Sequence, residues 1–197
     1  MIITIGREHG SGGHEIARAL AEALGYACYD KEIVDHAAEA SHFSREVMDS
    51  FDEKRVSPYV VPVPNFVGMG ESFRLNMHVA AAQFEAIRSL AEQGNAIFVG
   101  RCADYVLRNR EDLLRVFIQA GEESRTREMM KRRDLSEEQA RKLIRQVDKD
   151  RASYYRYYTD QDWGEREYYD LCINSDKVGV QGAVTIIKAY LEAMGQA

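Results

Sequence analysis

A glycine-rich run near the start of the chain points most directly to chemistry. Residues 6–13 are Gly-Arg-Glu-His-Gly-Ser-Gly-Gly, and they separate an apolar, β-branched stretch from a helical pattern. Such a loop turns free backbone N–H groups toward an anion, and glycine allows positive φ and close approach of phosphate oxygens. The run predicts a nucleotide phosphate site; the alternative is a tight strand-to-helix turn without a ligand. The residues expected to form this site are Gly6, Gly10, Ser11, Gly12, Gly13, His14 and Glu15.

This loop differs from the standard triphosphate-binding loop at the positions that matter most for transfer of a phosphoryl group. The standard loop ends in Gly-Lys and then Ser or Thr; the lysine reaches the β- and γ-phosphates, and the hydroxyl binds Mg²⁺. Here Gly13 stands at the lysine position, and His14 and Glu15 follow it. Either Arg7, His14 or an arginine from elsewhere supplies the missing charge, or the loop binds phosphate without transferring it.

Arginines outside the loop are suitable phosphate ligands because a guanidinium group can grip two phosphate oxygens at once. Arg101 follows an apolar run that predicts a central strand, and open α/β sheets bind ligands at the carboxyl ends of their strands. A structural ion pair is the alternative for Arg101.

Residues 125–156 hold eleven Lys or Arg and six Asp or Glu, on a chain of net charge −6. A basic segment on an acidic body favours a small anionic ligand over nucleic acid.

Within that basic segment, a solvated helix face is the alternative to phosphate binding for every residue. Arg151 is the strongest candidate because it ends an Asp148-x-x-Arg151 element. The other basic candidates are Arg132, Arg133, Arg145 and Lys149.

Acidic side chains could complete the site. Asp30 directly follows a predicted strand, where it could accept a hydrogen bond from a ribose or orient an acceptor phosphate through Mg²⁺. Its alternative is the N-cap of the helix that begins at Lys31. Glu8 or Glu15, beside the loop, could bind Mg²⁺ through water. The histidines and cysteines lack metal-ligand spacing, so we expect no metal site made by protein ligands alone.

The elements that must position these residues follow an alternating pattern of short apolar runs and helical periods, which is typical of βα units on a parallel sheet. We predict strands at residues 2–6, 26–29, 96–99, 113–119 and 169–174. We predict helices at residues 13–24, 31–40, 71–93, 122–133, from a Ser136 N-cap into 154–158, and at 179–194. The expected fold is α/β: a single doubly wound domain over residues 1–197 with a five-stranded parallel sheet.

Residues 56–70 interrupt this pattern, because they contain all three prolines. Proline removes a backbone donor and fixes φ, so the segment is no central strand. We interpret it either as an arm onto a partner subunit, giving a homo-oligomer, or a flap over a site, or as a locally packed loop.

Composition favours a cytoplasmic protein that binds neither membranes nor nucleic acid. No apolar run approaches the roughly 20 residues that span a bilayer, and the N-terminus lacks the features of a secretory signal. The three cysteines, an odd number beside apolar runs, indicate buried reduced thiols instead of a disulfide framework.

Four segments together resemble the cytidylate kinase-like family, a divergent branch of the nucleoside monophosphate kinases. These segments are residues 6–17, 29–32, 99–104 and 169–174, in the family's order. The resemblance implies a P-loop kinase fold with ATP phosphates on the first loop. It also implies a helical acceptor-binding insertion at about 40–94 and a mobile basic lid at 130–160.

The resemblance carries over to individual positions. Asp30 matches the family's Asp after the second strand, Gly100-Arg101 matches its Gly-Arg after the third, and Cys102 stands where the family has Asp. Substrate-binding roles are thereby implied for Asp30, Arg101, Asp104, Asp148 and Arg151. Catalytic roles are expected for Arg7, Arg101 and Arg151.

Two functions are consistent with these features. The first is transfer of the γ-phosphoryl group of ATP, with Mg²⁺, to a nucleoside monophosphate such as CMP or dCMP, or to a similar small acceptor. The second is a non-catalytic regulatory protein that binds a nucleotide or phosphate on a degraded P-loop.

Overall fold

A computed structural model describes residues 1–41, 43–54 and 68–195 of the chain. Five parallel strands form one sheet in the order β2-β3-β1-β4-β5, which confirms the predicted fold class. The strands are β1 (Ile2–Arg7), β2 (Ala27–Tyr29), β3 (Ala96–Val99), β4 (Leu113–Gln119) and β5 (Leu171–Asn174). Because all five run in one direction, their carboxyl ends lie along a single edge of the sheet, where the site forms.

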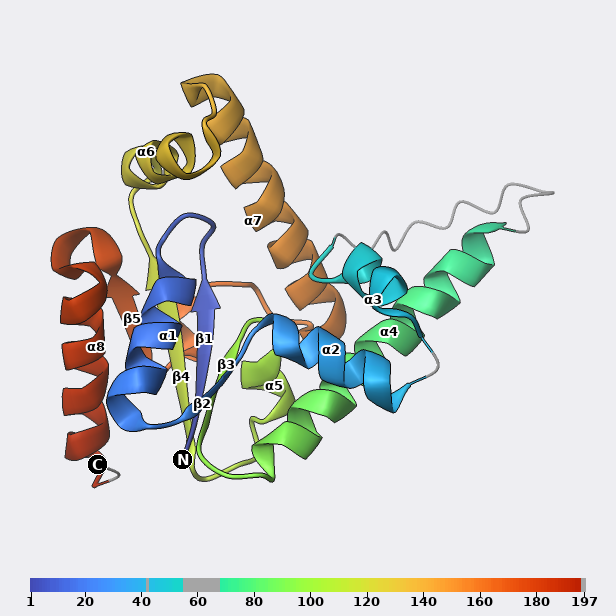
Figure 1. The fold of residues 1–197 in the computed structure, drawn as a ribbon, viewed down its shortest axis with the longest axis horizontal. Helices are drawn as coiled ribbons and strands as arrows, with labels where there is room; N and C mark the ends of the chain where they lie inside the picture. The colour runs from blue at the N-terminus through green and yellow to red at the C-terminus, as the bar shows by residue number, and fades with distance from the viewer. Residues whose placement is uncertain (42, 55–67, 196–197) are drawn as a thin grey trace.

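Helices cover both faces of the sheet (Figure 1). On one face lie α1 (Gly13–Leu24) and α8 (Ser175–Ala193); on the other lie α2 (Lys31–Ala40), α4 (Gly68–Ala91) and α5 (Ala103–Val106). Successive strand side chains point to opposite faces, so Ile3 and Ile5 join the α1–α8 core while Ile2 joins the other. Each helical layer thus has its own apolar core against the sheet.

Two further helices form a hairpin that projects from the carboxyl edge of the sheet (Figure 1). These are α6 (Glu122–Arg133) and α7 (Glu137–Thr159), which pack through Met129, Ala140 and Ile144. Ser136 caps α7 in a reciprocal capping box with Gln139, as predicted for its N-cap. A short 3₁₀ helix, η1 (Arg166–Tyr168), leads into β5.

Apart from shifts of a few residues at the ends of elements, the structure differs from the predicted elements mainly at three helices. Helices α3 (Arg45–Phe51) and α5 were not predicted, because both are too short for a helical period to show in the sequence. Helix α8 begins at Ser175, four residues before the predicted start, because the Asn174 side chain caps it. Gly179, with φ of 65°, interrupts the regular helix geometry at the predicted start.

Residues 56–70, interpreted as an arm, a flap or a packed loop, lie mostly outside the described part of the chain, which lacks 55–67. The interpretation therefore stays a prediction, as does a homo-oligomer built on this segment.

No helix in the described part of the chain is long and apolar enough to cross a membrane. Cys28, Cys102 and Cys172 are free thiols. The prediction that all three are buried is confirmed for Cys102 only, because Cys28 is half-buried and Cys172 is exposed on the edge strand β5.

Candidate active site

The glycine run forms the turn between β1 and α1 and leaves backbone N–H groups available. Gly10 and Gly12 have φ of 82° and 78°, which a residue with a side chain rarely adopts. The first intrahelical bond of α1 runs from the Ile16 N–H to the Gly12 carbonyl. The amides of the preceding turn have no intrahelical acceptor, and a Cβ at Gly12 would meet nothing within 4 Å. The loop therefore presents donors to open space.

Hollows flank this loop on two sides. One, of about 430 Å³, lies between the loop, the end of β2 and the hairpin; its lining includes His14, Asp30, Lys31, Arg132 and Arg133. The other, also about 430 Å³, lies between the loop and the starts of α6 and α8; its lining includes Ser11, Ser124, Lys131, Ser175 and Gly179. We call the first, which contains His14 and Asp30, the acid–base hollow, and the second the outer hollow.

Gly13, at the position of the standard lysine, is constrained by Arg7. A Cβ on Gly13 would lie 2.5 Å from Arg7 Cβ and 2.9 Å from Arg7 Cγ, atoms close to the backbone that cannot swing away. The stem of Arg7 thus fills the space that a side chain at position 13 would need. A lysine cannot enter the loop at this position without displacing Arg7.

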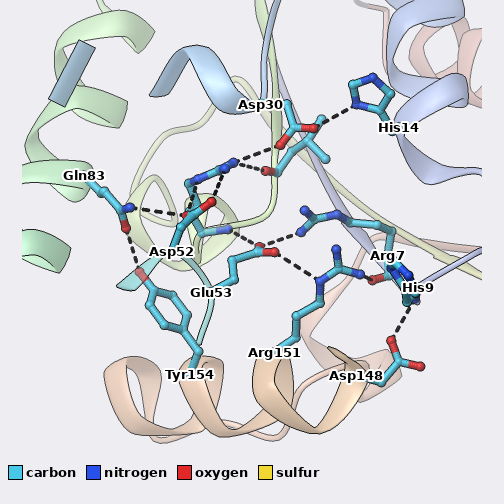
Figure 2. A network of polar contacts seen from close by, with 12 residues as sticks. Arg7, His9, His14, Asp30, Asp52, Glu53, Gln83, Asp148, Arg151 and Tyr154 are labelled. Atoms are coloured by element: carbon cyan, nitrogen blue, oxygen red, sulfur yellow. Dashed lines mark hydrogen bonds and ion pairs between the residues drawn. The ribbon is translucent and has the colours of Figure 1, made fainter. Parts of the chain in front are cut away.

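Glu53, which follows helix α3, lies at the centre of a buried charge cluster (Figure 2). Its carboxylate accepts from Arg7 Nη1 at 2.6 Å, from the Arg101 backbone N–H at 2.9 Å and from Arg151 Nε at 3.1 Å. Burial alone would raise the pKa of Glu53, but Arg7, Arg151 and Arg101 hold it well below its ordinary value. Two of the three expected catalytic arginines, Arg7 and Arg151, therefore share one carboxylate.

Arg101 is 2% exposed, and its side chain makes four hydrogen bonds to protein groups. Asp52 accepts from its Nε at 2.8 Å and from its Nη2 at 2.6 Å, a bidentate pair. Its Nη1 donates to Asp30 at 3.0 Å and to the Val99 carbonyl at 3.2 Å. These contacts correspond to the ion-pair alternative; a role in ligand binding stays a prediction.

The backbone around Arg101 is strained. Gly100, Arg101 and Cys102 all have positive φ, as does Glu53. Left-handed conformations cost a residue with a Cβ about 1–2 kcal/mol, and such strain concentrates at functional sites. Here the turn aims the Arg101 N–H at Glu53, and a Cβ at Gly100 would collide with the Arg7–Glu53 pair.

Asp30 stands at the N-cap position of α2 but makes no side-chain cap bond. Its Oδ2 instead lies 2.8 Å from His14 Nδ1, while its Oδ1 accepts from Arg101 (Figure 2). Burial alone would raise the pKa of Asp30, but Arg101 and Arg7 hold it below its ordinary value. Asp30 is therefore ionised and joins the charge cluster to the loop.

The predicted lid residues divide between two places. Arg132 and Arg133 line the acid–base hollow, where Arg132 pairs with Glu15 at 2.6 Å. No carboxylate partner of Arg133 occurs among the described residues. Arg145 and Lys149 lie along another face of α7, where Arg145 pairs with Glu122 at 2.9 Å.

Asp148 and Asp104 hold other groups in place. Asp148 accepts from the His9 backbone N–H at 2.8 Å and from Arg125 at 2.5 Å, and so joins α7 to the loop. Asp104 is buried, lines a small cavity that Gly6 and Arg7 also line, and accepts from the Tyr155 hydroxyl at 2.7 Å. Their predicted contacts with substrate stay predictions.

Sequence reasoning missed Asp52 and Glu53, which neutralise all three expected catalytic arginines. No sequence signal connected them, because buried arginines need buried counter-charges but the sequence does not show which arginines are buried. The acidic pair at 52–53 lies in the insertion, too far along the chain for local pattern to connect it with Arg7 or Arg151.

Comparison with known proteins agrees with this architecture. The cytidylate kinase-like family matches residues 2–177, nearly the whole chain. The chain belongs to this family. A cytidylate kinase of Methanothrix thermoacetophila is 26% identical over 196 residues, which cover 98% of this chain and 99% of that protein.

Solved structures share the fold of this cytidylate kinase-like chain. An uncharacterized protein from Eubacterium ventriosum is 31% identical, with a TM-score of 0.75 and 98% of both chains covered. A shikimate kinase from Bacteroides thetaiotaomicron has a TM-score of 0.57 over 98% of both chains. At 15% identity the latter is evidence for the fold alone.

Proposed function

We propose that this protein is an ATP-dependent phosphotransferase, which moves the γ-phosphoryl group of ATP to a small acceptor of about nucleoside monophosphate size. Its family makes CMP and dCMP the first acceptors to test, and a nucleotide kinase of this kind would work in the cytoplasm. The observation that carries the proposal is the open glycine loop between two hollows. Donor and acceptor must lie on opposite sides of the transferred group, because the displacement is in line.

On the donor side, the amides at the start of α1 would hold the phosphates, and the outer hollow would hold the nucleoside. Arg133 lines the acid–base hollow without a carboxylate partner among the described residues, so it could bind the phosphates without breaking an ion pair. Arg7 and Arg151 would reach them by exchanging Glu53 for phosphate oxygens, and would neutralise the charge that spreads during transfer. Arg101 would act indirectly, by holding Asp30.

The residues fit a magnesium ion that is carried by the nucleotide. Among the described residues no group of three His, Cys, Asp or Glu could hold a metal, and His14 replaces the usual hydroxyl. Mg²⁺ keeps several waters and is commonly bound through substrate phosphates. Glu15, which lines both hollows, is placed to bind such an ion through water. When bound, the ion would neutralise phosphate charge.

Two glycines at opposite ends of α1 test the donor site. Gly12 and Gly25 both have left-handed φ and open space at the Cβ position, so alanine imposes similar backbone strain on each. Titration calorimetry should show ATP binding by the wild type and by Gly25→Ala. Gly12→Ala should bind at least about 10-fold more weakly, since its Cβ would enter the phosphate cradle. Equal affinity in the two variants would contradict the assigned site.

The neutralisation of the arginines by Asp52 and Glu53 also favours the alternative of a non-catalytic nucleotide-binding protein. A coupled assay of ADP release separates the two, with nucleoside monophosphates and the corresponding nucleosides as acceptors. ADP release that depends on an acceptor supports the phosphotransferase. ATP binding without turnover on any acceptor supports the regulatory protein.

A further inference from the structure

The carboxylate of Glu53 accepts hydrogen bonds from three donors that would also suit a phosphate group (Figure 2). These donors come from three elements: Arg7 Nη1 from the end of β1, the Arg101 backbone N–H from the turn after β3, and Arg151 Nε from α7. Guanidinium groups and backbone amides are the donors that bind phosphate oxygens in proteins. A carboxylate of the chain itself therefore uses groups that could bind a ligand.

Arg7 and Arg151 stand in the wall between two cavities. Both arginines line the acid–base hollow, and both also line a cavity of about 20 Å³, which Glu53 lines as well. Glu53 is not among the residues that line the hollow. A phosphate beside the glycine loop thus meets the two arginines from the hollow, and Glu53 meets them from the smaller cavity. While Glu53 holds them, its negative charge offsets the attraction that they offer to a second anion.

The neighbouring carboxylate, Asp52, takes no part in this competition. It holds the buried Arg101 guanidinium through two hydrogen bonds, and it also accepts from Gln83 Nε2 at 3.3 Å. Arg101 is not among the residues that line the hollow, so a ligand there does not reach this pair. Asp52 therefore fixes the chain, and Glu53, one residue later, faces the two arginines that a ligand can reach.

The backbone of Glu53 is in a conformation that favours its release. Its φ is 48°, in the left-handed region, where a residue with a Cβ is strained. Gly100 lies against the Arg7–Glu53 pair, and a Cβ at Gly100 would collide with both partners. The ion pairs offset the strain at Glu53 as long as they last. Once the arginines turn to another anion, the strain favours the departure of Glu53.

We propose that Glu53 is an autoinhibitory counter-ion, which withholds Arg7 and Arg151 from phosphate in the acid–base hollow until the charge of the ligand displaces it. A site that is free for only a fraction of the time binds its ligand with an affinity lowered by that fraction. The neutralisation of the two arginines is then reversible, and it sets how much phosphate charge must enter the hollow before they turn to it. This inference rests on the proposed function for the identity of the ligand, a phosphate group.

Inorganic phosphate alone tests the competition. Glu53→Gln keeps the shape of the side chain and removes its charge. Melting temperatures over a range of phosphate concentrations, at constant ionic strength, give dissociation constants, because a ligand that binds the folded protein stabilises it. We expect phosphate to bind Glu53→Gln at least about 10-fold more tightly than the wild type.

Glu122→Gln is the matched control. Glu122 also holds two arginines, Arg141 at 3.2 Å and Arg145 at 2.9 Å, but these pairs are exposed on the hairpin and outside both hollows. This variant should bind phosphate as the wild type does. An equal gain in both variants would overturn the proposal, because it would reflect only the change in net charge. Equal or weaker binding by Glu53→Gln than by the wild type would overturn it too.

A measurement on the wild type decides the matter if Glu53→Gln does not fold. Arg151 Nε–H donates to Glu53 and Arg101 Nε–H donates to Asp52, so nitrogen-15 spectra of the arginine side chains report on both pairs. High phosphate concentrations should shift the Arg151 signal and leave the Arg101 signal in place. An unmoved Arg151 signal, or an equal shift of both, refutes the competition. A wild type that shows the expected shift but releases no ADP with any acceptor contradicts the phosphotransferase function alone.

Discussion

At the scale of single residues, Glu53 is the group on which the site depends. It joins Arg7 and Arg151 to the backbone of Arg101, and its carboxylate is almost surrounded by donors. Taking charges out of water is costly, and their mutual attraction offsets that cost only when every partner is present. Removal of one partner is therefore worse than absence of the whole cluster.

Replacement of Glu53 tests this dependence. Glu53→Ala leaves the Arg7 and Arg151 guanidinium groups without their shared partner, and we expect a loss of about 3–5 kcal/mol in the free energy of unfolding. Urea denaturation followed by circular dichroism measures it. Glu39→Ala, on the exposed face of α2, should change stability by less than about 0.5 kcal/mol. A loss of that small size in Glu53→Ala would show that the arginines find other partners or water.

At the scale of elements, the end of β1 and the start of α1 constrain each other. Arg7 is the last residue of β1 and Gly13 is the first of α1, and the Arg7 stem occupies the space above Gly13. Two positions therefore differ together from the standard loop. Gly13 has no side chain, and Arg7 of β1 fills the space that a side chain at position 13 would need.

A double-mutant cycle tests this coupling. Gly13→Ala alone should cost about 1–3 kcal/mol in stability, because its Cβ would lie 2.5 Å from Arg7 Cβ. In an Arg7→Gly background the next neighbour is Ile118 Cβ at 3.7 Å, an ordinary contact. There the same change should be neutral or stabilising, since alanine favours helix over glycine. Additive effects in chemical denaturation would refute the coupling.

At the scale of the whole molecule, the hairpin α6–α7 is joined to the glycine loop through His9. The His9 N–H donates to Asp148 of α7, and its carbonyl accepts from Arg125 of α6 at 3.3 Å. The ring's Nε2 atom is buried without a partner among the described residues. Burial, with Arg151, Arg133 and other nearby arginines, lowers the pKa of His9 to about 4.

This shift predicts a pH dependence of stability with a definite sign. The unfolded chain binds the His9 proton near pH 6.5, whereas the folded chain resists it down to about pH 4. The contribution is fully present above pH 6.5 and is lost as the pH falls toward 4. Between pH 7 and 5, after allowance for partial exposure, the wild type should lose about 1 kcal/mol more than His9→Gln. Urea titrations at several pH values measure this difference.

The control for that difference is His36→Gln, on α2 and outside both hollows, which should keep the wild-type dependence. Equal pH dependence in the wild type and His9→Gln would mean that the folded protein protonates His9 as readily as the unfolded chain does.

Much of this architecture was predictable because its causes are local. Short apolar runs predicted the five strands, helical periods predicted the longer helices, and glycines ahead of α1 predicted the open loop. Short elements such as α3 lacked a sequence signal. The partners of Arg7, Arg101 and Arg151 lacked one too, since Glu53 lies 46 and 98 residues away from Arg7 and Arg151.

The sequence by itself determined the fold class, the family and the glycine loop, because periodicity, turn chemistry and motif order act over a few neighbouring residues. Only the tertiary structure decided how the charges are used. It buried Arg101 between Asp30 and Asp52, placed Glu53 between Arg7 and Arg151, put the Arg7 stem above Gly13 and turned His14 to Asp30. Ion pairing depends on distance in space and on burial, and packing of the whole chain sets both.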